Sequence, residues 1–396
     1  EGCIIANMEI AKFTEELVQR YALTVPCVLC ANKNETSVMK IAILTQPLRT
    51  NFGGILQDYA LQTVLKRMGH EPVTVDYDCV YPWWRWMLGR FKSLVMRTSH
   101  HIQYPHYGRS GQENLNRFIH EKMTITKPEV TITKELLESL HPDAILVGSD
   151  QVWSPWCNVP IKYLGNMFLD FWPDFPGKRV AYAASFGGSE WIYTPEQEQL
   201  CGALAKKFDA ISVREASGVQ LCKEHFGVEA THVLDPTLLL TAKDYESLLS
   251  RQQNATNTLL AYVLDASLEK ITFLERMAKK YNLELKIKGA NDDISWDDSI
   301  EDWLSEIRDA AMVVTDSFHG SVFAIQFHRP FLSIVNKRRG AERFVSLLSR
   351  LELEDRLVYD ATTYEPTNHT INWNEVDACL AKEREMSMEF LKDALR

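Results

Sequence analysis

The feature that most constrains the fold is one run near the end of the chain, VVTDSFHGSVF at residues 313–323. It begins with apolar, β-branched residues, which indicate a buried strand, and it resumes at Ser321 as an apolar helical run. A strand, a polar turn and a helix in this order place side chains at the carboxyl edge of a parallel sheet, where open α/β sheets bind ligands. His319 is the most reactive group in the turn, beside helix-start amides that attract anions. We predict that this turn forms half of an active site; a helix cap with an incidental histidine is the alternative.

The same alternation of strand and helix continues along most of the chain. With 396 residues, the chain is long for a single hydrophobic core, so we expect two domains. The predicted strands form an earlier and a later series: 41–44, 73–77, 144–147, 179–184 and 210–213, then 259–264, 285–287, 312–315 and 331–335. We therefore predict an α/β fold with two Rossmann-like domains, 39–230 and 231–358. Residues 1–38 are an N-terminal appendage, and 359–396 are a C-terminal segment whose helix returns toward the first domain.

A glycine pair follows the first predicted strand. The sequence predicts a loop over 49–54, which contains Asn51, Gly53 and Gly54, and then a helix over 55–68. Glycines in such a loop let a ligand approach the backbone closely. The pattern is neither of the common glycine-rich nucleotide motifs, and a tight turn that requires glycine explains it equally well.

Polar and charged side chains also follow two other strands of the first series. Ser149 and Asp150 come after the strand at 144–147, and Arg214 comes after the strand at 210–213. An arginine at this edge is a rigid, permanent cation for a phosphate or a carboxylate. An ion pair with the neighbouring Glu215 is the alternative for Arg214.

The densest basic cluster follows the last strand of the second series. It reads KRRGAER at 337–343, and its candidate ligand-binding residues are Lys337, Arg338 and Arg343. A charge run is usually a solvated surface. At the end of a strand in an acidic protein, it is also a candidate clamp for an anion.

Composition excludes some classes of function. The net charge of −10 argues against nonspecific nucleic-acid binding as the main activity. The eight cysteines are scattered, which is typical of reduced intracellular thiols, and only Cys27 and Cys30 form a close pair. A single such pair is a weak metal or redox signal, so we favour ordinary thiols and expect no metal site. No apolar run is long enough to span a membrane, and no signal peptide is evident, so we expect a cytoplasmic protein.

Residues 81–107 are rich in tryptophan, arginine and lysine. Trp83, Met87, Phe91 and Val95 fall on one helical stripe. Such a stretch can rest on a membrane surface or hold a lipid-linked or sugar acceptor. A flap that packs on its own domain is the more common outcome.

Six short segments, taken in order, resemble the polysaccharide pyruvyl transferase family. The first three are NFGG followed by LQDYAL at 51–61, VGSDQVW at 147–153 and YAASFG at 182–187. The others are ISVREAS at 211–217, DPT at 235–237 and TDSFHG at 315–320. Each segment alone is weak, but six in the order of the family are fairly specific. The resemblance covers about residues 39–358.

The resemblance implies a GT-B-like fold, in which two Rossmann-like domains face each other across a cleft, with the acceptor side in the first domain and the donor side in the second. It implies transfer of the pyruvyl group of phosphoenolpyruvate to two hydroxyls of a sugar, as a ketal, in surface or exopolysaccharide biosynthesis. The histidine of the family falls on His319 and its arginine on Arg214. Some members carry an arginine where this chain has Ser317, so Lys337, Arg338 or Arg343 would supply the missing charge.

These roles suit the chemistry. Phosphoenolpyruvate carries a phosphate and a carboxylate, which require fixed cations, and a histidine can carry the proton that carbon 3 gains. We therefore predict His319 as general acid–base and Arg214 as the phosphate clamp. Asn51, Gly53 and Gly54 would line the site, Asp150 would orient an acceptor hydroxyl, and Ser149 and Ser317 are further candidate substrate-binding residues. The donor is a substrate, so no cofactor is expected.

Two other functions stay open at this point. One is a GT-B glycosyltransferase that uses a nucleotide sugar. The other is not enzymatic: a sugar-binding or scaffold protein, or a redox partner that uses Cys27 and Cys30. The expected partners of the enzyme are a small-molecule donor and a sugar or lipid-linked oligosaccharide, with contact to the inner membrane face through 81–107 as an open alternative.

Overall fold

The computed structural model describes residues 38–48, 51–77, 112–129, 131–158, 161–249, 252–289, 298–335, 340–365 and 370–396. Several predictions fall outside these residues: those on Cys27 and Cys30, on almost all of the 1–38 appendage, on 81–107, and on Lys337 and Arg338. Residues Met39–Arg396 form one compact unit, and the description below concerns that unit.

The first half of this unit is built on a parallel sheet. Among the described residues it has six strands in the order β2-β1-β3-β4-β5-β6. They are β1 (Lys40–Leu44), β2 (Glu71–Thr74), β3 (Ala144–Gly148), β4 (Lys178–Ala184), β5 (Ala210–Val213) and β6 (Thr231–His232). The central strand β3 is buried along its whole length, as expected for a parallel sheet that is covered on both faces.

The second half is built on another parallel sheet. Its strands, within the described part of the chain, follow the order β11-β10-β9-β7-β8. They are β7 (Thr258–Tyr262), β8 (Glu284–Lys288), β9 (Met312–Thr315), β10 (Phe331–Ile334) and β11 (Leu357–Val358). Two parallel sheets with helical crossovers are two Rossmann-like folds, so the predicted α/β, GT-B-like fold class is confirmed.

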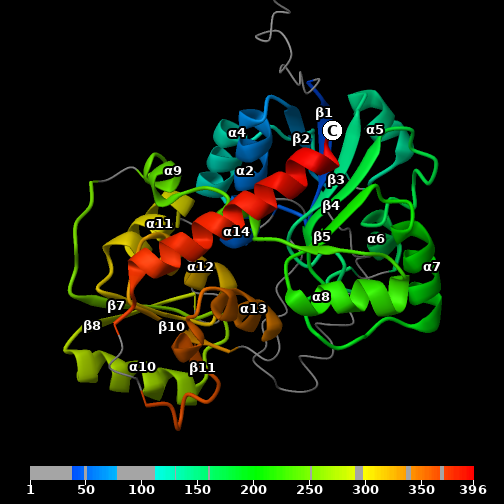
Figure 1. Cartoon of the computed structure of the whole chain (residues 1–396). Coiled ribbons are helices and arrows are strands. Elements are labelled where there is room, and N and C mark those ends of the chain that lie inside the picture. The colour runs from blue at the N-terminus through cyan, green and yellow to red at the C-terminus, as the bar shows by residue number, and fades with distance from the viewer. Residues whose placement is uncertain are drawn as a thin grey trace, which may run out of the picture. The chain divides into compact units, whose positions relative to one another are not determined.

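The helices connect and cover these strands (Figure 1). In the first half they are α2 (Phe52–Arg67), α4 (Glu113–Lys122), α5 (Lys134–Leu140), α6 (Ile161–Asn166), α7 (Pro195–Ala205) and α8 (Ala216–Leu221), which continues as the π-helix η1 (Cys222–Phe226). The others are the 3₁₀ turn η2 (Pro236–Leu238), α9 (Ala242–Glu246), α10 (Leu268–Tyr281), α11 (Ile300–Asp309), α12 (Phe318–Gln326), α13 (Glu342–Arg350), the 3₁₀ turn η4 (Glu354–Arg356) and α14 (Trp373–Ala394).

Two helices begin three residues earlier than the sequence predicted, and both corrections matter for the site. Helix α2 begins at Phe52, so Gly53 and Gly54 lie in its first turn and not in a loop. Helix α12 begins at Phe318, because Ser317 caps it by accepting a hydrogen bond from the backbone N–H of Gly320. His319 therefore lies inside the first helical turn. The sequence predicted a glycine loop for ligand approach or a tight turn, whereas Gly53 lies in a helix and makes room for the His319 side chain.

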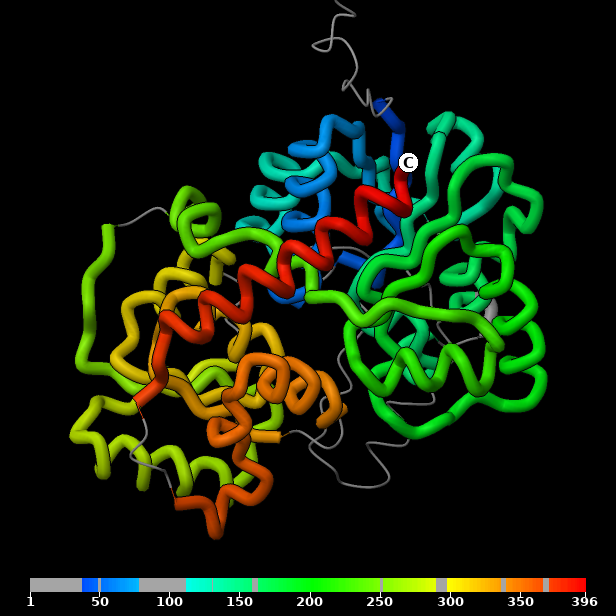
Figure 2. Tube along the Cα trace, viewed as in Figure 1, coloured from blue at the N-terminus to red at the C-terminus, as the bar shows by residue number. Residues whose placement is uncertain are grey.

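The last helix, α14, contacts both halves of the unit. Near its start, Trp373 stacks on His328, which follows α12, at a ring separation of 4.9 Å. Near its end, Phe390 contacts Tyr182 of β4. In Figure 2 the red tube of α14 runs from the second half of the unit toward the first. Strand β6 pairs with β5, so the first sheet extends slightly beyond residue 230; the domain limits themselves stay a prediction.

One hydrophobic core joins the elements that will carry the site. It contains buried side chains of α2, of η2, of α12 and of α14, among them Leu56, Leu238, Phe323 and Leu391. The ends of these elements are consequently held in fixed positions relative to one another.

Candidate active site

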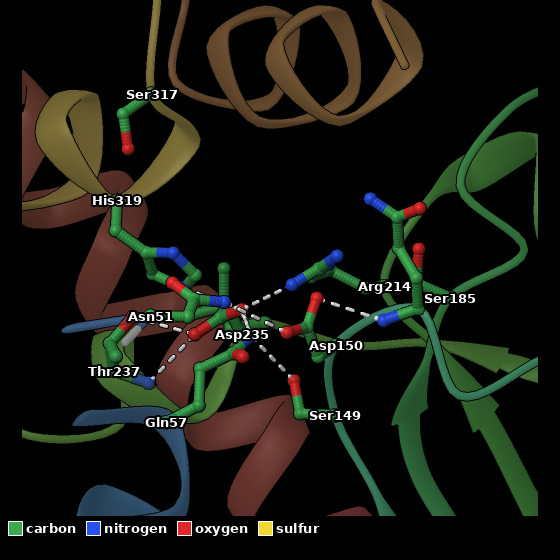
Figure 3. Close-up of polar contacts among 12 residues, drawn as sticks. Asn51, Gln57, Ser149, Asp150, Ser185, Arg214, Asp235, Thr237, Ser317 and His319 are labelled. Atoms are coloured by element: carbon green, nitrogen blue, oxygen red, sulfur yellow. Dashed lines mark hydrogen bonds and ion pairs between the residues drawn. The ribbon is translucent and has the colours of Figure 1, made fainter. Parts of the chain in front are cut away.

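A buried carboxylate, Asp235, lies at the centre of the polar cluster in Figure 3. It directly precedes η2, and Pro236 begins that turn. Its Oδ1 accepts hydrogen bonds from the backbone N–H of Thr237 at 3.0 Å and from the Thr237 hydroxyl at 2.6 Å. Its other oxygen, Oδ2, is thereby turned toward the groups that come from α2, β5 and α12.

Three side chains from distant parts of the chain approach Asp235 Oδ2. Arg214 Nη1 donates to it at 2.9 Å, and Gln57 Nε2 of α2 also donates to it. His319 Nε2 lies 3.8 Å away, which is too long for a hydrogen bond but within the range of an ion pair. Side chains from both halves of the unit therefore converge on this one oxygen atom.

Asp235 is ionised at neutral pH. Burial alone would raise the pKa of this carboxyl group, but His319, Arg214 and Thr237 outweigh that effect and hold its pKa well below the ordinary value. The site thus contains a permanent negative charge between a guanidinium and an imidazole.

His319 is held against the first turn of α2. Its side chain is only 7% exposed, and its Nε2 is buried without a hydrogen-bond partner. A Cβ atom on Gly53 would lie 1.9 Å from His319 Nδ1, so any other residue at 53 would collide with the ring. Gly53 is required here for close approach, not for a tight turn.

Two of the three guanidinium nitrogens of Arg214 donate hydrogen bonds, and the third has no hydrogen-bond partner. Its Nε donates to Glu215 Oε1 at 3.2 Å and its Nη1 to Asp235, while Nη2 is buried without a hydrogen-bond partner. Its guanidinium lies 4.9 Å from the centre of the Phe318 ring. Burial opposes the charge, but Glu215, Asp235 and Asp150 prevail and raise the pKa of Arg214 above its ordinary value.

A second arginine lies over the same ring. Arg343 of α13 is 5.8 Å from the centre of Phe318 and is 9% exposed. Burial and the nearby positive charge of Arg214 lower the pKa of Arg343 to about 10, against the attraction of Asp150 and Glu215. The structure thus places one of the three candidate basic residues next to Arg214.

The turn after β3 forms another side of the cluster. Ser149 and Asp150 both have positive φ, 34° and 65°, which is an uncommon backbone conformation for residues other than glycine. Ser149 Oγ accepts a hydrogen bond from Gln57 Nε2 at 2.9 Å. Asp150 Oδ2 accepts one from Asn51 Nδ2 at 3.3 Å, and a Cβ on Gly54 would lie 3.4 Å from the same oxygen.

The structure therefore brings together most of the predicted site residues. They are Asn51, Gly53, Gly54, Ser149, Asp150, Arg214, His319 and Arg343; their roles stay predictions. Ser317 is buried and caps α12, so its described contact is structural.

Sequence reasoning missed Asp235 and Gln57 as site residues. Asp235 follows a strand of only two residues, β6, which is too short to be recognised from periodicity. Gln57 lies in the interior of a long helix, where a glutamine is usually on the surface, yet it is 1% exposed. Two of the six family segments contain these residues, LQDYAL at 56–61 and DPT at 235–237, and the second is also typical of a side-chain-capped turn.

No group of three or more His, Cys, Asp or Glu side chains within the described residues is arranged to hold a metal ion. None of their helices combines the length and the apolar character that a membrane span needs.

The fold and the cluster together are those of a GT-B-like α/β protein with polar groups at the carboxyl ends of its strands. Residues 51–338 match a family model described as polysaccharide pyruvyl transferase, which is more than half of the chain. The chain therefore belongs to the polysaccharide pyruvyl transferase family and is a transferase. No match to a curated protein was found.

Solved structures with a similar chain arrangement include proteins that act on nucleotide sugars. A putative UDP-N-acetylglucosamine 2-epimerase from Listeria monocytogenes has a TM-score of 0.48 and 10% identity, over 89% of this chain and 90% of that one. UDP-GlcNAc 2-epimerase from Neisseria meningitidis has a TM-score of 0.42 and 12% identity, over 90% and 94%. An alpha-glucosyltransferase in complex with UDP and DNA has a TM-score of 0.42 and 12% identity, over 90% and 95%. These TM-scores are below 0.5, so the fold assignment rests on the two sheets themselves.

Proposed function

We propose that this transferase moves the pyruvyl group of phosphoenolpyruvate to two hydroxyls of a sugar and releases phosphate. The observation that supports this most is a pair of buried nitrogen atoms without partners, Arg214 Nη2 and His319 Nε2. They come from different sheets and belong to side chains that share one contact, Asp235 Oδ2. Buried polar groups are costly to leave unpaired, so such a pair indicates a ligand with acceptor oxygens.

The proposed reaction balances without a cofactor. Carbon 3 of the donor takes a proton, carbon 2 becomes electrophilic, and the first sugar hydroxyl forms a C–O bond there and loses its proton. The bond between carbon 2 and the phosphate oxygen then breaks, the phosphate leaves with the electron pair, and the second hydroxyl forms the other C–O bond. The two hydroxyls lose two protons in total. One balances the proton that carbon 3 gained, and the other leaves with the phosphate.

Each step has a candidate residue in the cluster. Arg214 would bind the phosphate or the carboxylate of the donor through Nη2, and Arg343 would add a second positive charge beside it. His319 would give the proton to carbon 3 and take one from an attacking hydroxyl. Asp150, which already accepts a hydrogen bond from Asn51, would orient the acceptor. We also propose a cytoplasmic role in the synthesis of surface or exopolysaccharide, with a free or lipid-linked sugar as acceptor.

The test is turnover with phosphoenolpyruvate and a panel of sugar diols, followed as phosphate release and as pyruvyl ketal on the acceptor. His319→Gln should lower the rate by roughly 10²–10⁴-fold, which is the usual cost of losing a general acid–base. His328→Gln is a matched control, since His328 also contacts an aspartate, Asp377, but is 42% exposed and lies nine residues further along the chain.

Two results would contradict the proposal. One is near-normal transfer by the His319→Gln variant with its fold intact. The other is transfer from a nucleotide sugar, with no reaction of phosphoenolpyruvate, which would establish the competing glycosyltransferase function.

A further inference from the structure

We infer that Asp235 is a positioning residue that holds the His319 imidazole and the Arg214 guanidinium in one arrangement and stabilises the charged form of that imidazole. This inference rests on the proposed function for its role in transfer. The electrostatic part can be tested without any turnover.

Asp235 cannot turn away from the site. Thr237 fixes Oδ1 with both its backbone N–H and its hydroxyl. Arg214 and Gln57 then fix Oδ2 from two other elements. Four donors therefore determine the position of one carboxylate, and its side chain is 1% exposed.

His319 is likewise held close to Asp235. The ring is packed against Gly53 on its Nδ1 side, where even a methyl group would not fit. The other ring nitrogen, Nε2, is buried and has Asp235 Oδ2 at 3.8 Å as a charged neighbour. The imidazole is thus confined between the first turn of α2 and the carboxylate.

Both positive and negative groups lie near the His319 ring. Besides Asp235, the charged groups of this cluster are the cations Arg214 and Arg343, which oppose a charged imidazole, and the carboxylates Glu215 and Asp150, which favour it. The phenols of Tyr182 and Tyr245 also feel the charge of Asp235, but their pKa values are well above neutrality because they are buried, so they stay neutral. Asp235 is the carboxylate that lies within ion-pair distance of the ring.

The experiment measures the protonation midpoint of the His319 imidazole by NMR in the full chain with labelled histidine. The chain has 11 histidines, so the His319 signal is assigned by its loss in His319→Gln. Asp235→Asn keeps the shape but removes the charge, and the midpoint should move to lower pH by about one to three units, as expected for an opposite charge at this distance.

A second variant predicts the opposite sign. Gln57→Leu removes one donor from Asp235 Oδ2 and leaves its negative charge less compensated, so the midpoint should move to higher pH. This variant keeps the inference testable if Asp235→Asn fails to fold. Asp316→Asn is the matched control, because Asp316 is also fully buried and lies three residues before His319, but pairs with Lys270. It should leave the midpoint unchanged even where it lowers stability.

The outcomes separate the two proposals. Folded Asp235→Asn and Gln57→Leu variants with the wild-type midpoint would overturn the role of Asp235. A midpoint that moves as predicted supports that role, and the low-pH and high-pH limits of the transfer rate should then move in the same direction. A protein that shows these shifts but never turns over phosphoenolpyruvate would retain the coupling between Asp235 and His319, and the proposed function alone would fail.

Discussion

Two buried arginines in this protein are each followed directly by an acidic residue, and they are used differently. Arg308 donates to its neighbour Asp309 through Nε at 2.8 Å and through Nη2 at 3.2 Å. Arg214 gives only Nε to its neighbour Glu215, sends Nη1 to Asp235, and has Nη2 without a partner. The first pair is a closed fork, in which two nitrogens of the arginine bind the same carboxylate. In the second pair, one nitrogen of the arginine has no hydrogen-bond partner.

The positions of the two pairs in the sheets explain the difference. Arg308 and Asp309 end α11 and precede β9, at the amino end of that strand, where Asp309 also accepts from the backbone N–H of Asn254. Arg214 follows β5, at the carboxyl end, where open parallel sheets bind ligands. A buried Arg–acid pair is thus structural at one edge of a sheet and a candidate binding group at the other.

The largest difference should appear in the rate of transfer. Arg214→Lys keeps a charge but loses the fork, so transfer from phosphoenolpyruvate should fall by roughly 10²–10³-fold, the usual cost of one lost preorganised donor. Arg308→Lys should keep the wild-type rate per folded molecule. Phosphate release, normalised to the folded fraction, measures both, and equal losses in the two variants would remove the distinction.

The next effect concerns stability. Arg308→Met leaves Asp309 buried without its main partner, and breaking a buried ion pair in this way typically costs about 3–5 kcal/mol of unfolding free energy. The double variant Arg308→Met with Asp309→Leu should lose less, because no charge is then left uncompensated. Urea unfolding of the three proteins tests this, and a double variant as unstable as the single one would be evidence against the closed-fork interpretation.

A third prediction concerns the close contact between Gly53 and the His319 ring, which holds that ring near Asp235 and Arg214. Gly53→Ala adds a methyl group that must push the His319 ring away from Asp235, so the rate should fall at least tenfold, with an overpacking cost of about 1–3 kcal/mol. Gly188→Ala is the control, since a Cβ at that position meets nothing within 4 Å. Rates and urea midpoints are measured for both, and a normal rate in Gly53→Ala would mean that the ring position does not matter.

The smallest effect comes from a buried carboxyl group with no ion-pair partner among the described contacts. Asp58 of α2 accepts a hydrogen bond from Thr74, and burial raises its pKa to about 7. Because the folded pKa lies above the unfolded value, the stabilising contribution is complete below about pH 4 and is lost as the pH rises through 7. Between pH 6 and 8, wild type should lose about 1 kcal/mol more than Asp58→Asn in urea unfolding. Parallel pH profiles would contradict this.

Much of the fold was predictable because its signals are local. Strands β5 and β9 have the predicted limits, since buried apolar runs mark them. Helix α10 also has local signals, because Ser267 caps its start and Asn282 ends it in a left-handed conformation. The starts of α2 and α12 were not predictable in the same way. Position 53 requires glycine because the ring of His319 in α12 occupies the space that a Cβ would need, and no local pattern contains that information.

The candidate site was predictable only in part for the same reason. His319 and Arg214 follow recognisable strands, and the family resemblance marked both. Asp235 and Gln57 are equally central in the structure, but one follows a two-residue strand and the other lies within a helix. Their proximity is set by how α2, η2 and α12 pack into one core. Both residues lie within segments that resemble the family, but their contacts could not be predicted from those segments alone.

The bond between α14 and the segment before Asp235 has a consequence for biosynthesis. The backbone N–H of Leu234 donates to the Ser387 hydroxyl at 2.9 Å, and Arg384 Nε donates to the carbonyl of Leu238, the last residue of η2. Ser387 and Arg384 lie 153 and 146 residues after their partners, so a growing chain can form these two hydrogen bonds only after α14 has been synthesised. We expect that cleaving or shortening α14 would remove both hydrogen bonds and loosen the turn that carries Asp235, with every residue of the cluster still present.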